Sequence, residues 1–203
     1  YNIFNKISVS NYALVYGDYW KKYYSKVYYN DENKIYIIGS PDLDDFDENV
    51  KRPEELTICY LATVLVEDAM VGREDFLKFI SSLNNATKKY KLKIKLHPRS
   101  DKNLYNELKN SEFIEGSNFP IAHLYIGHMS TINAKALYVT DNLILYDFNP
   151  HIKNMYSEFT NFNCNSVDQL ENMIELAIGS AINPPSKKIA EKFWHNPQGA
   201  IKS

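Results

Sequence analysis

Several features that mark particular protein classes are scarce in these 203 residues. There are two cysteines, Cys59 and Cys164, and they lie too far apart in the sequence to suggest a disulfide framework. We therefore expect reduced thiols in a cytosolic protein. No apolar run is long enough to span a bilayer. The formal net charge is only −2, which argues against nucleic acid as a partner, because proteins that bind it carry a basic face.

Common sequence signatures of catalytic and cofactor sites are also missing. There is no P-loop, no Gly-x-Gly-x-x-Gly fingerprint and no Gly-x-Ser-x-Gly elbow. The acidic run at residues 42–48 lacks the ligand spacing and the glycine of an EF-hand, so a solvated loop is preferred and a divalent-metal site is the alternative. His123 and His128 do not have the spacing of zinc ligands. We expect neither a bound metal nor a separate cofactor.

The chain does contain a regular alternation of short apolar runs and helical periodicity from residue 57 to residue 181. Hydrophobic residues make up 44%, which is enough for a core that needs no disulfide or metal. Such alternation predicts an α/β fold with a Rossmann-like parallel sheet and helices on both faces. The expected strands are 34–38, 57–66, 92–96, 113–114, 124–126 and 143–146. The expected helices are 73–90, 102–110, 131–139, 167–178 and 187–194.

No internal repeat or low-complexity tract divides the chain. We expect residues 34–203 to form one α/β domain. Residues 1–33 are expected to be an N-terminal segment, either a remnant of a missing N-terminal domain or a contact with it. The chain opens with Tyr1 and no signal peptide follows, so its start looks trimmed. The aromatic residues Tyr19, Trp20, Tyr23 and Tyr24 have helical spacing and are expected in a core rather than in a ligand site.

Polar residues that directly follow expected strands are the main candidates for a site. In parallel sheets, ligands bind beyond the carboxyl ends of the strands, near the point where the strand order reverses. His97, Pro98 and Arg99 follow the strand at 92–96, and Pro98 forces the chain to turn there. His97 could donate a hydrogen bond or a proton to a phosphate. The alternative is a structural bond from His97 to the backbone.

A second candidate site follows the strand at 124–126. Gly127 and His128 form a turn, and Ser130 and Thr131 open the next helix. The first amides of a helix have no intrahelical partner, and the helix dipole favours an anion there. This segment therefore predicts a phosphate site, with capping of the helix by Ser130 as the alternative.

A third candidate, the pair Glu67 and Asp68, ends the long apolar run at 57–66. Carboxylates at this edge could contact a ribose or a base. A solvated acidic loop at a helix start is the alternative.

The order of these motifs resembles the C-terminal half of GT-B glycosyltransferases. The resemblance covers roughly residues 34–201. More narrowly, the chain is similar to CMP-dependent bacterial enzymes: capsular polysialyltransferases, lipooligosaccharide sialyltransferases and CDP-glycerol polyol-phosphate transferases. The resemblance rests on three segments, which are 95–98, 125–131 with the Ala-rich helix that follows, and 144–147. In this group an His-Pro motif and a Ser/Thr motif hold the cytidine nucleotide, which implies this role for His97-Pro98 and for Ser130-Thr131.

The resemblance implies a sialyltransferase-like glycosyltransferase that moves a sugar from a CMP-activated donor to a bacterial surface glycan. His97, Ser130, Thr131 and the helix amides would stabilise the charge on the leaving phosphate. The acidic base motif of the family, an acidic pair followed by glycine, is missing, since Ala69 follows Asp68. The catalytic base is therefore expected outside this chain.

Two other functions stay open from the sequence. A transferase of the same fold could use a UDP-sugar, a GDP-sugar or CDP-glycerol. A non-catalytic nucleotide-binding or assembly module would explain the missing base. The expected location is cytoplasmic, with at most peripheral contact at the inner membrane face.

Overall fold

The computed structural model describes residues 11–27, 31–41, 51–108, 111–140, 142–149, 157, 160–180 and 191–194. The chain divides into two compact units. The first comprises Tyr1–Glu48 together with Lys187–Ser203, and the second comprises Asn49–Ser186. The boundary expected after residue 33 falls inside the first unit, and the domain assignment itself stays a prediction.

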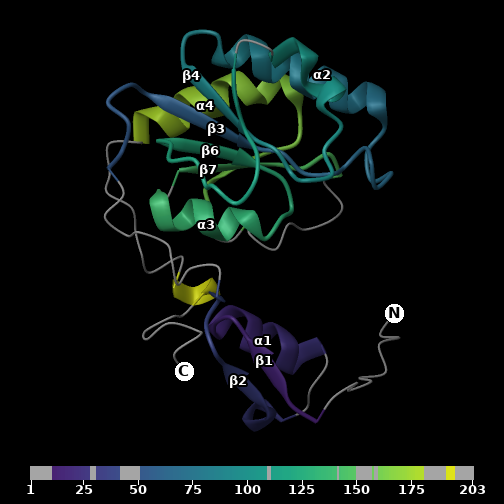
Figure 1. Ribbon diagram of the computed structural model, residues 1–203, viewed down its shortest axis with the longest axis vertical. Helices are drawn as coiled ribbons and strands as arrows, with labels where there is room; N and C mark the ends of the chain where they lie inside the picture. Colours follow the sequence, from purple (N-terminus) through teal and green to yellow (C-terminus); the bar gives the residue numbers. More distant parts are fainter. Residues whose placement is uncertain are drawn as a thin grey trace. The chain divides into compact units, whose positions relative to one another are not determined.

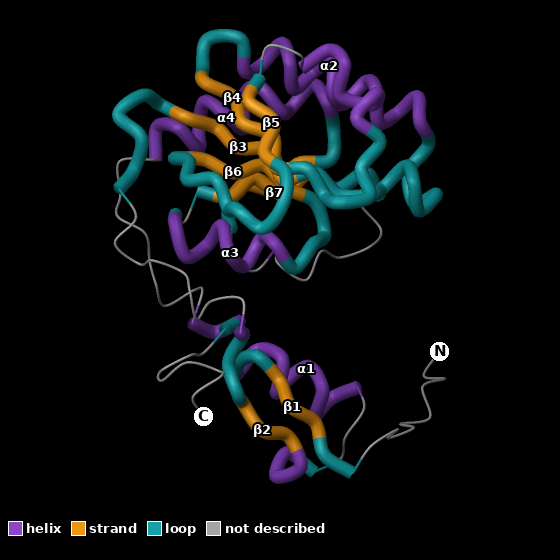
Figure 2. The backbone as a smooth tube through the Cα atoms, viewed as in Figure 1, coloured by secondary structure: helices purple, strands orange, loops and turns teal. Residues whose placement is uncertain are grey.

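The second unit is built on a six-stranded parallel sheet with the strand order β5-β4-β3-β6-β7-β8 (Figure 2). Its strands are β3 (Thr57–Leu61), β4 (Lys91–Lys95), β5 (Glu112–Ile114), β6 (Leu124–Gly127), β7 (Leu143–Tyr146) and β8 (Phe162–Cys164). The chain runs outward from β3 to β5 and then returns to pair β6 with the other side of β3. The strand order therefore reverses between β3 and β6, which is where ligands bind in such sheets.

Helices cover both faces of this sheet. The helices α2 (Arg73–Thr87) and α4 (Val167–Ser180) lie on one face, and α3 (Ile132–Val139) lies on the other (Figure 1). The expected Rossmann-like α/β fold is thereby confirmed.

The main core lies between the sheet and the α2/α4 layer. Because successive strand residues point to opposite faces, Ile58 and Tyr60 reach this core. The helix α2 buries Phe76, Phe79, Ile80 and Leu83, which are spaced along one helical face. Burying a side chain of this size contributes roughly 1.5 to 3 kcal/mol. The aromatic packing continues at the carboxyl end of the sheet, where the rings of Phe79 and Tyr146 are 4.5 Å apart.

Several elements differ from the prediction. The strand expected at 57–66 ends at Leu61, and the chain then turns, with the amide of Met70 bonded to the carbonyl of Leu65. Leu65 is buried against the core, so the apolar run reflects burial rather than an extended strand. The helix expected at 102–110 is the 3₁₀ helix η3 (Lys102–Leu108), and β8 was not predicted. Of the helix expected at 187–194, only residues 191–194 are described, and 191–193 are helical.

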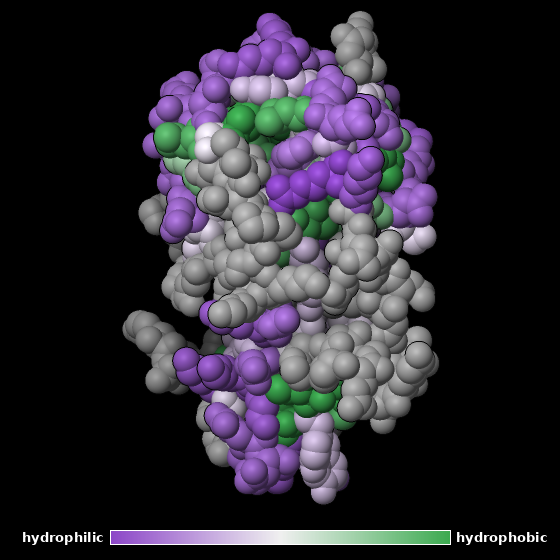
Figure 3. Space-filling model, turned by 90° about the vertical axis from the view of Figure 1, so that its left-hand side faces the viewer, coloured by the Kyte–Doolittle hydropathy of each residue, from purple (hydrophilic) through white to green (hydrophobic). Residues whose placement is uncertain are grey.

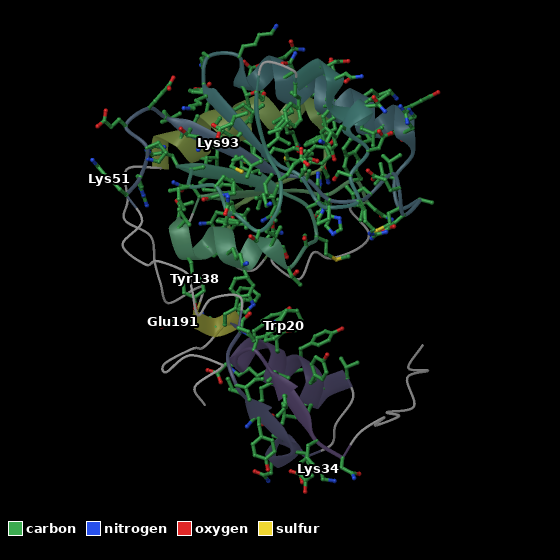
Figure 4. The ribbon with its side chains drawn as sticks, in the orientation of Figure 1. Trp20, Lys34, Lys51, Lys93, Tyr138 and Glu191 are labelled. Carbon is green, nitrogen blue, oxygen red and sulfur yellow. The ribbon has the colours of Figure 1, made fainter. Side chains whose placement is uncertain are left out.

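In the first unit, β1 (Ala13–Val15) and β2 (Ile35–Ile37) pair in parallel and are joined by α1 (Asp18–Val27) and the short η1 (Glu32–Lys34). Trp20, labelled in Figure 4, and Tyr24 pack against the buried strand residues of this unit. Trp20 and Tyr24 are half-buried, α1 buries no side chain fully and Tyr23 is 38% exposed, so the expected core placement is met only in part.

Hydrophilic side chains occupy much of the described surface on the face seen in Figure 3. Among the residues that the structure describes, no helix combines the length and the apolar character needed to cross a membrane.

Candidate functional site

Three loops meet at the carboxyl edge of the sheet, beyond β3, β4 and β6. The strands β4 and β6 pair with opposite sides of β3 and run parallel to it. Adjacent strands lie about 4.8 Å apart, so the ends of β4 and β6 are roughly 10 Å apart. His97 and the segment 127–131 therefore share one edge, as expected, with a single strand between them.

The loop after β4 holds His97 in a turn. The amide of Arg99 donates to the His97 Nδ1 at 3.2 Å, and the His97 carbonyl accepts from the amide of Ser100 at 2.9 Å. Because Nδ1 accepts, the proton of the neutral ring is on Nε2, which becomes a hydrogen-bond donor. The half-buried ring thus combines a backbone bond with a donor suited to a phosphate oxygen.

The acidic pair Glu67 and Asp68, in the loop after β3, forms hydrogen bonds with the loop after β4. Asp68 accepts two hydrogen bonds from the Arg99 guanidinium, at 2.8 and 2.9 Å, and this interaction lowers the pKa of Asp68. The Oε1 atom of Glu67 accepts the amide of Asp101 at 2.7 Å. These contacts hold the loops after β3 and β4 together, and contact of Glu67 or Asp68 with a ribose or base stays a prediction. Arg99 likewise commits two of its donors to Asp68.

The loop after β6 leads into α3, whose first turn carries no side-chain cap. Thr131 precedes α3 with helical dihedrals (φ −64°, ψ −24°) and makes no side-chain capping hydrogen bond, and the capping alternative for Ser130 stays a prediction. The Ser130 carbonyl accepts the amide of Asn133 at 3.2 Å, while its side chain is half-buried and that of Thr131 is exposed. An uncapped helix start flanked by two hydroxyls suits an anion.

Asn133 stabilises this loop and was not predicted from the sequence. Its side chain is fully buried and its Nδ2 atom donates to the His128 carbonyl. A Cβ atom at position 127 would come within 2.3 Å of the Asn133 Oδ1 atom, so Gly127 is needed for this close approach. The sequence signal for this arrangement is a single asparagine on the apolar face of a helix.

The His128 side chain is held inside the protein. It is 2% exposed and lies between the Tyr146 carbonyl, 2.8 Å from Nδ1, and the Tyr60 hydroxyl, 2.9 Å from Nε2. The carbonyl can only accept, so Nδ1 carries the proton and Nε2 accepts from Tyr60. Burial lowers the pKa of His128 to about 4, so the ring is neutral at pH 7. With both nitrogens engaged, the ring has no free nitrogen to bond a phosphate, and the expected substrate contact of His128 stays a prediction.

A cavity of about 560 Å³ opens at the same sheet edge, on the side of α2 and α4. His128 and Met129 contribute to its lining, but His97, Ser130 and Thr131 do not. The expectation that these three residues converge on one pocket is therefore not met by this cavity, although all of them lie at the same edge.

Within the described residues, no group of three or more His, Cys, Asp or Glu side chains could hold a metal ion. The acidic run at 42–48 lies outside these residues. Cys59 and Cys164 are buried free thiols, and burial raises the pKa of both, which disfavours the thiolate.

The sequence matches no protein-family model and no curated protein at a significant level. Among solved structures, a variant of the wall teichoic acid polymerase TagF is similar, with a TM-score of 0.52 and 15% identity over 94% of this chain and 55% of that chain. The UDP-GlcNAc 2-epimerase of Methanocaldococcus jannaschii, in complex with UDP-GlcNAc and UDP, gives 0.51 and 16% over 79% of this chain and 54% of that chain.

The chain thus spans about half the length of these structures. At such low identity the likeness shows the fold alone. That fold is the Rossmann-like α/β architecture of GT-B proteins, as the sequence resemblance implied.

Proposed function

We propose that this chain is the nucleotide-binding half of a glycosyltransferase or polyol-phosphate transferase. The observation that carries the proposal is the pairing of two phosphate-competent features at the edge where the strand order reverses. His97 follows β4 with its Nε2 as a donor, and the uncapped start of α3 follows β6. The strands that lead to these two features end roughly 10 Å apart, on either side of β3, which suits a ligand that spans the end of β3.

In this proposal the α3 start holds the phosphate of the donor. Its amides and the hydroxyls of Ser130 and Thr131 provide donors and positive potential without a mobile side chain. When the bond to the transferred group breaks, negative charge grows on the leaving phosphate, and preorganised donors stabilise that charge. His97 adds a hydrogen bond or a proton from the other side of β3. The donor nucleotide is the substrate, and the proposal includes no separate cofactor.

The donor is proposed to be a cytidine nucleotide. The resemblance of the His-Pro and Ser/Thr motifs to CMP-dependent enzymes favours a CMP-sugar, which makes the protein sialyltransferase-like. CDP-glycerol is the second candidate. It is supported by the fold likeness to TagF, one structure of which was soaked with CDPG and matches 90% of this chain with a TM-score of 0.51.

A full enzyme needs more than this chain. The similar chains are about twice as long as the part that this chain matches. We propose that a further domain supplies the catalytic base and helps to bind a glycan acceptor, and that the protein works in the cytoplasm with at most peripheral membrane contact. Without that domain the chain would be a nucleotide-binding module, so binding rather than turnover is the first test.

Isothermal titration of the chain with CMP, CDP-glycerol, UMP and GMP tests the proposal. We expect CMP and CDP-glycerol to bind more tightly than UMP or GMP. Equal affinity for all four ligands would remove the cytidine assignment, and no binding of any of them would overturn the proposed function. A stronger response to CDP-glycerol than to CMP would select the polyol-phosphate reaction.

A further inference from the structure

The cavity of about 560 Å³ beside the proposed nucleotide site has the size of a small-molecule pocket. It opens where two helices begin, since Gly72 precedes α2, Ser166 precedes α4, and both line it. Asp147, which follows β7, lines it as well. The cavity is therefore at the ligand-binding edge of the sheet but on the opposite face from α3.

Aromatic rings form an uncharged wall of the cavity. The ring of Phe148 lies 5.3 Å from that of His128, with an interplanar angle of 30°, and 4.9 Å from that of Tyr146. It also stacks on Phe76 at 6.1 Å, which anchors it in the core. The hydrogen bonds from Tyr60 and to Tyr146 fix His128 as a neutral ring. A flat apolar wall of this kind suits the CH face of a ring-shaped ligand.

The rest of the lining is polar but not basic. Asp75 and Lys78 form an exposed ion pair at 3.1 Å, and Asp147 adds a second carboxylate, which leaves a formal charge of −1 among the charged lining residues. Asn149, Asn165 and Ser166 add amide and hydroxyl groups. The basic side chain of the lining, Lys78, is already paired with Asp75, which disfavours a phosphate, whereas carboxylate and amide groups bind hydroxyls well.

We propose that this cavity binds an uncharged polyhydroxylated group, a sugar or polyol, with its apolar face on Phe148 and its hydroxyls on the polar lining. The identification of that group as a transferase substrate rests on the proposed function. The same chemistry is present in the transferred group of a donor and in the end of a glycan acceptor. These two sources differ in whether an intact donor, which carries its own copy of the transferred group, displaces a bound sugar probe.

Nuclear magnetic resonance titration of the ¹⁵N-labelled chain tests the proposal. The probes are methyl β-D-glucopyranoside, methyl N-acetyl-β-D-glucosaminide and glycerol, with inorganic phosphate as the charged comparison. We expect at least one neutral probe to shift the amide signals of Gly72, Asp147 and Ser166 in a saturable way, and phosphate to leave them in place. If no neutral probe shifts these signals, or if phosphate shifts them more, the proposal is wrong.

Two leucine substitutions give a matched comparison. Gly72 has a φ of −63°, and a Cβ atom there would meet nothing closer than the Asp75 Oδ2 atom at 3.8 Å, so Gly72→Leu places a side chain at the rim without backbone strain. Gly179→Leu puts the same side chain in open space near the end of α4. We expect Gly72→Leu to abolish the shifts and Gly179→Leu to retain them. Wild-type sugar binding by Gly72→Leu would contradict the proposal.

A single polar contact can be tested as well. Asn165→Ala removes an exposed amide outside the core. We expect it to weaken probe binding roughly threefold to tenfold, which is the usual effect of losing one neutral hydrogen bond. An unchanged affinity would exclude Asn165 from the site.

Repeating the titration with a saturating intact donor, a CMP-sugar or CDP-glycerol, and separately with saturating CMP separates the two sources. Displacement of the probe by the intact donor but not by CMP identifies the transferred group of the donor, and probe binding that is retained with both identifies an acceptor group. If CMP does not bind but the sugar does, the proposed function fails while the sugar site stands.

Discussion

Two histidines follow strands of the same sheet at the same edge, yet their surroundings differ. His97, in the loop after β4, is half-buried, bonds the Arg99 amide through Nδ1 and has Nε2 as a donor. His128, in the loop after β6, is 2% exposed and uses both nitrogens within the protein. A position after a parallel strand therefore predicts the edge at which a residue lies. The direction of its side chain decides whether it contacts ligand or core.

Of the substitutions that test the difference between the two histidines, His128→Ala is expected to have the largest effect. This change leaves a cavity among the aromatic rings and removes the acceptor of the buried Tyr60 hydroxyl. We expect the free energy of unfolding, measured by urea titration, to fall by about 3 kcal/mol. His97→Ala is the matched control and should change stability by less than about 0.5 kcal/mol. Similar losses in both variants would contradict the contrast between the two loops.

The buried state of His128 also predicts a loss of stability in acid. The pKa of His128 is lowered from 6.5 to about 4 in the folded chain. The unfolded chain therefore binds the proton more readily, and the free energy of unfolding falls as the pH drops from about 6.5 towards 4. At pH 4.5 this contribution is a loss of roughly 2 to 3 kcal/mol relative to pH 7.

The control for this acid effect is His128→Gln, which cannot titrate. Urea titrations at both pH values should show the stability gap between wild type and His128→Gln narrowing in acid. A gap that is independent of pH would mean that His128 is not held neutral by burial.

His97→Ala tests whether His97, unlike His128, contacts the ligand. Removing the Nε2 donor should weaken CMP binding tenfold to roughly 100-fold, the usual effect of losing a hydrogen bond to a charged group. His123→Gln is the matched control, because His123 precedes β6 and lies at the opposite edge of the sheet. Isothermal titration checks both variants. Equal losses would indicate an indirect effect of the substitutions.

The smallest expected effect is that of Ser130→Ala. The amides at the start of α3 remain in this variant, so CMP affinity should fall only about threefold to tenfold. Ser111→Ala removes another half-buried hydroxyl, next to the amino end of β5, and should leave the affinity unchanged. A loss of CMP affinity as large as that of His97→Ala would mean that the Ser130 hydroxyl contributes more to binding than the helix amides do.

Much of the fold could be predicted from residue patterns. The periodicity of α2 and the apolar runs of β4, β6 and β7 correspond closely to the observed elements. The three residues of β8 are too few to give a period, and their pairing with β7 depends on contacts far away in the sequence. The run at 57–66 predicts one strand because a buried turn containing Leu65 is as apolar as a strand, whereas β3 ends at Leu61.

The site was predictable only as far as the edge of the sheet. The order of strand and polar residue gave the position of His97 and of the segment 127–131. The Tyr60–His128 hydrogen bond joins residues 68 positions apart, and the Asp68–Arg99 pair joins residues 31 apart. No local pattern encodes such contacts. The sequence alone therefore does not predict that both ring nitrogens of His128 are hydrogen-bonded within the protein, or that Glu67 and Asp68 bond the loop after β4.

The central claim is that a cytidine nucleotide binds across the end of β3, between the loop after β4 and the start of α3. A ¹⁵N amide titration of the chain with CMP tests it most directly. The account predicts saturable shifts at His97 and Arg99 and at Gly127 to Ile132, with none at Ser111 or His123 on the opposite edge. Shifts confined to that opposite edge, or no shifts at all, would contradict the account.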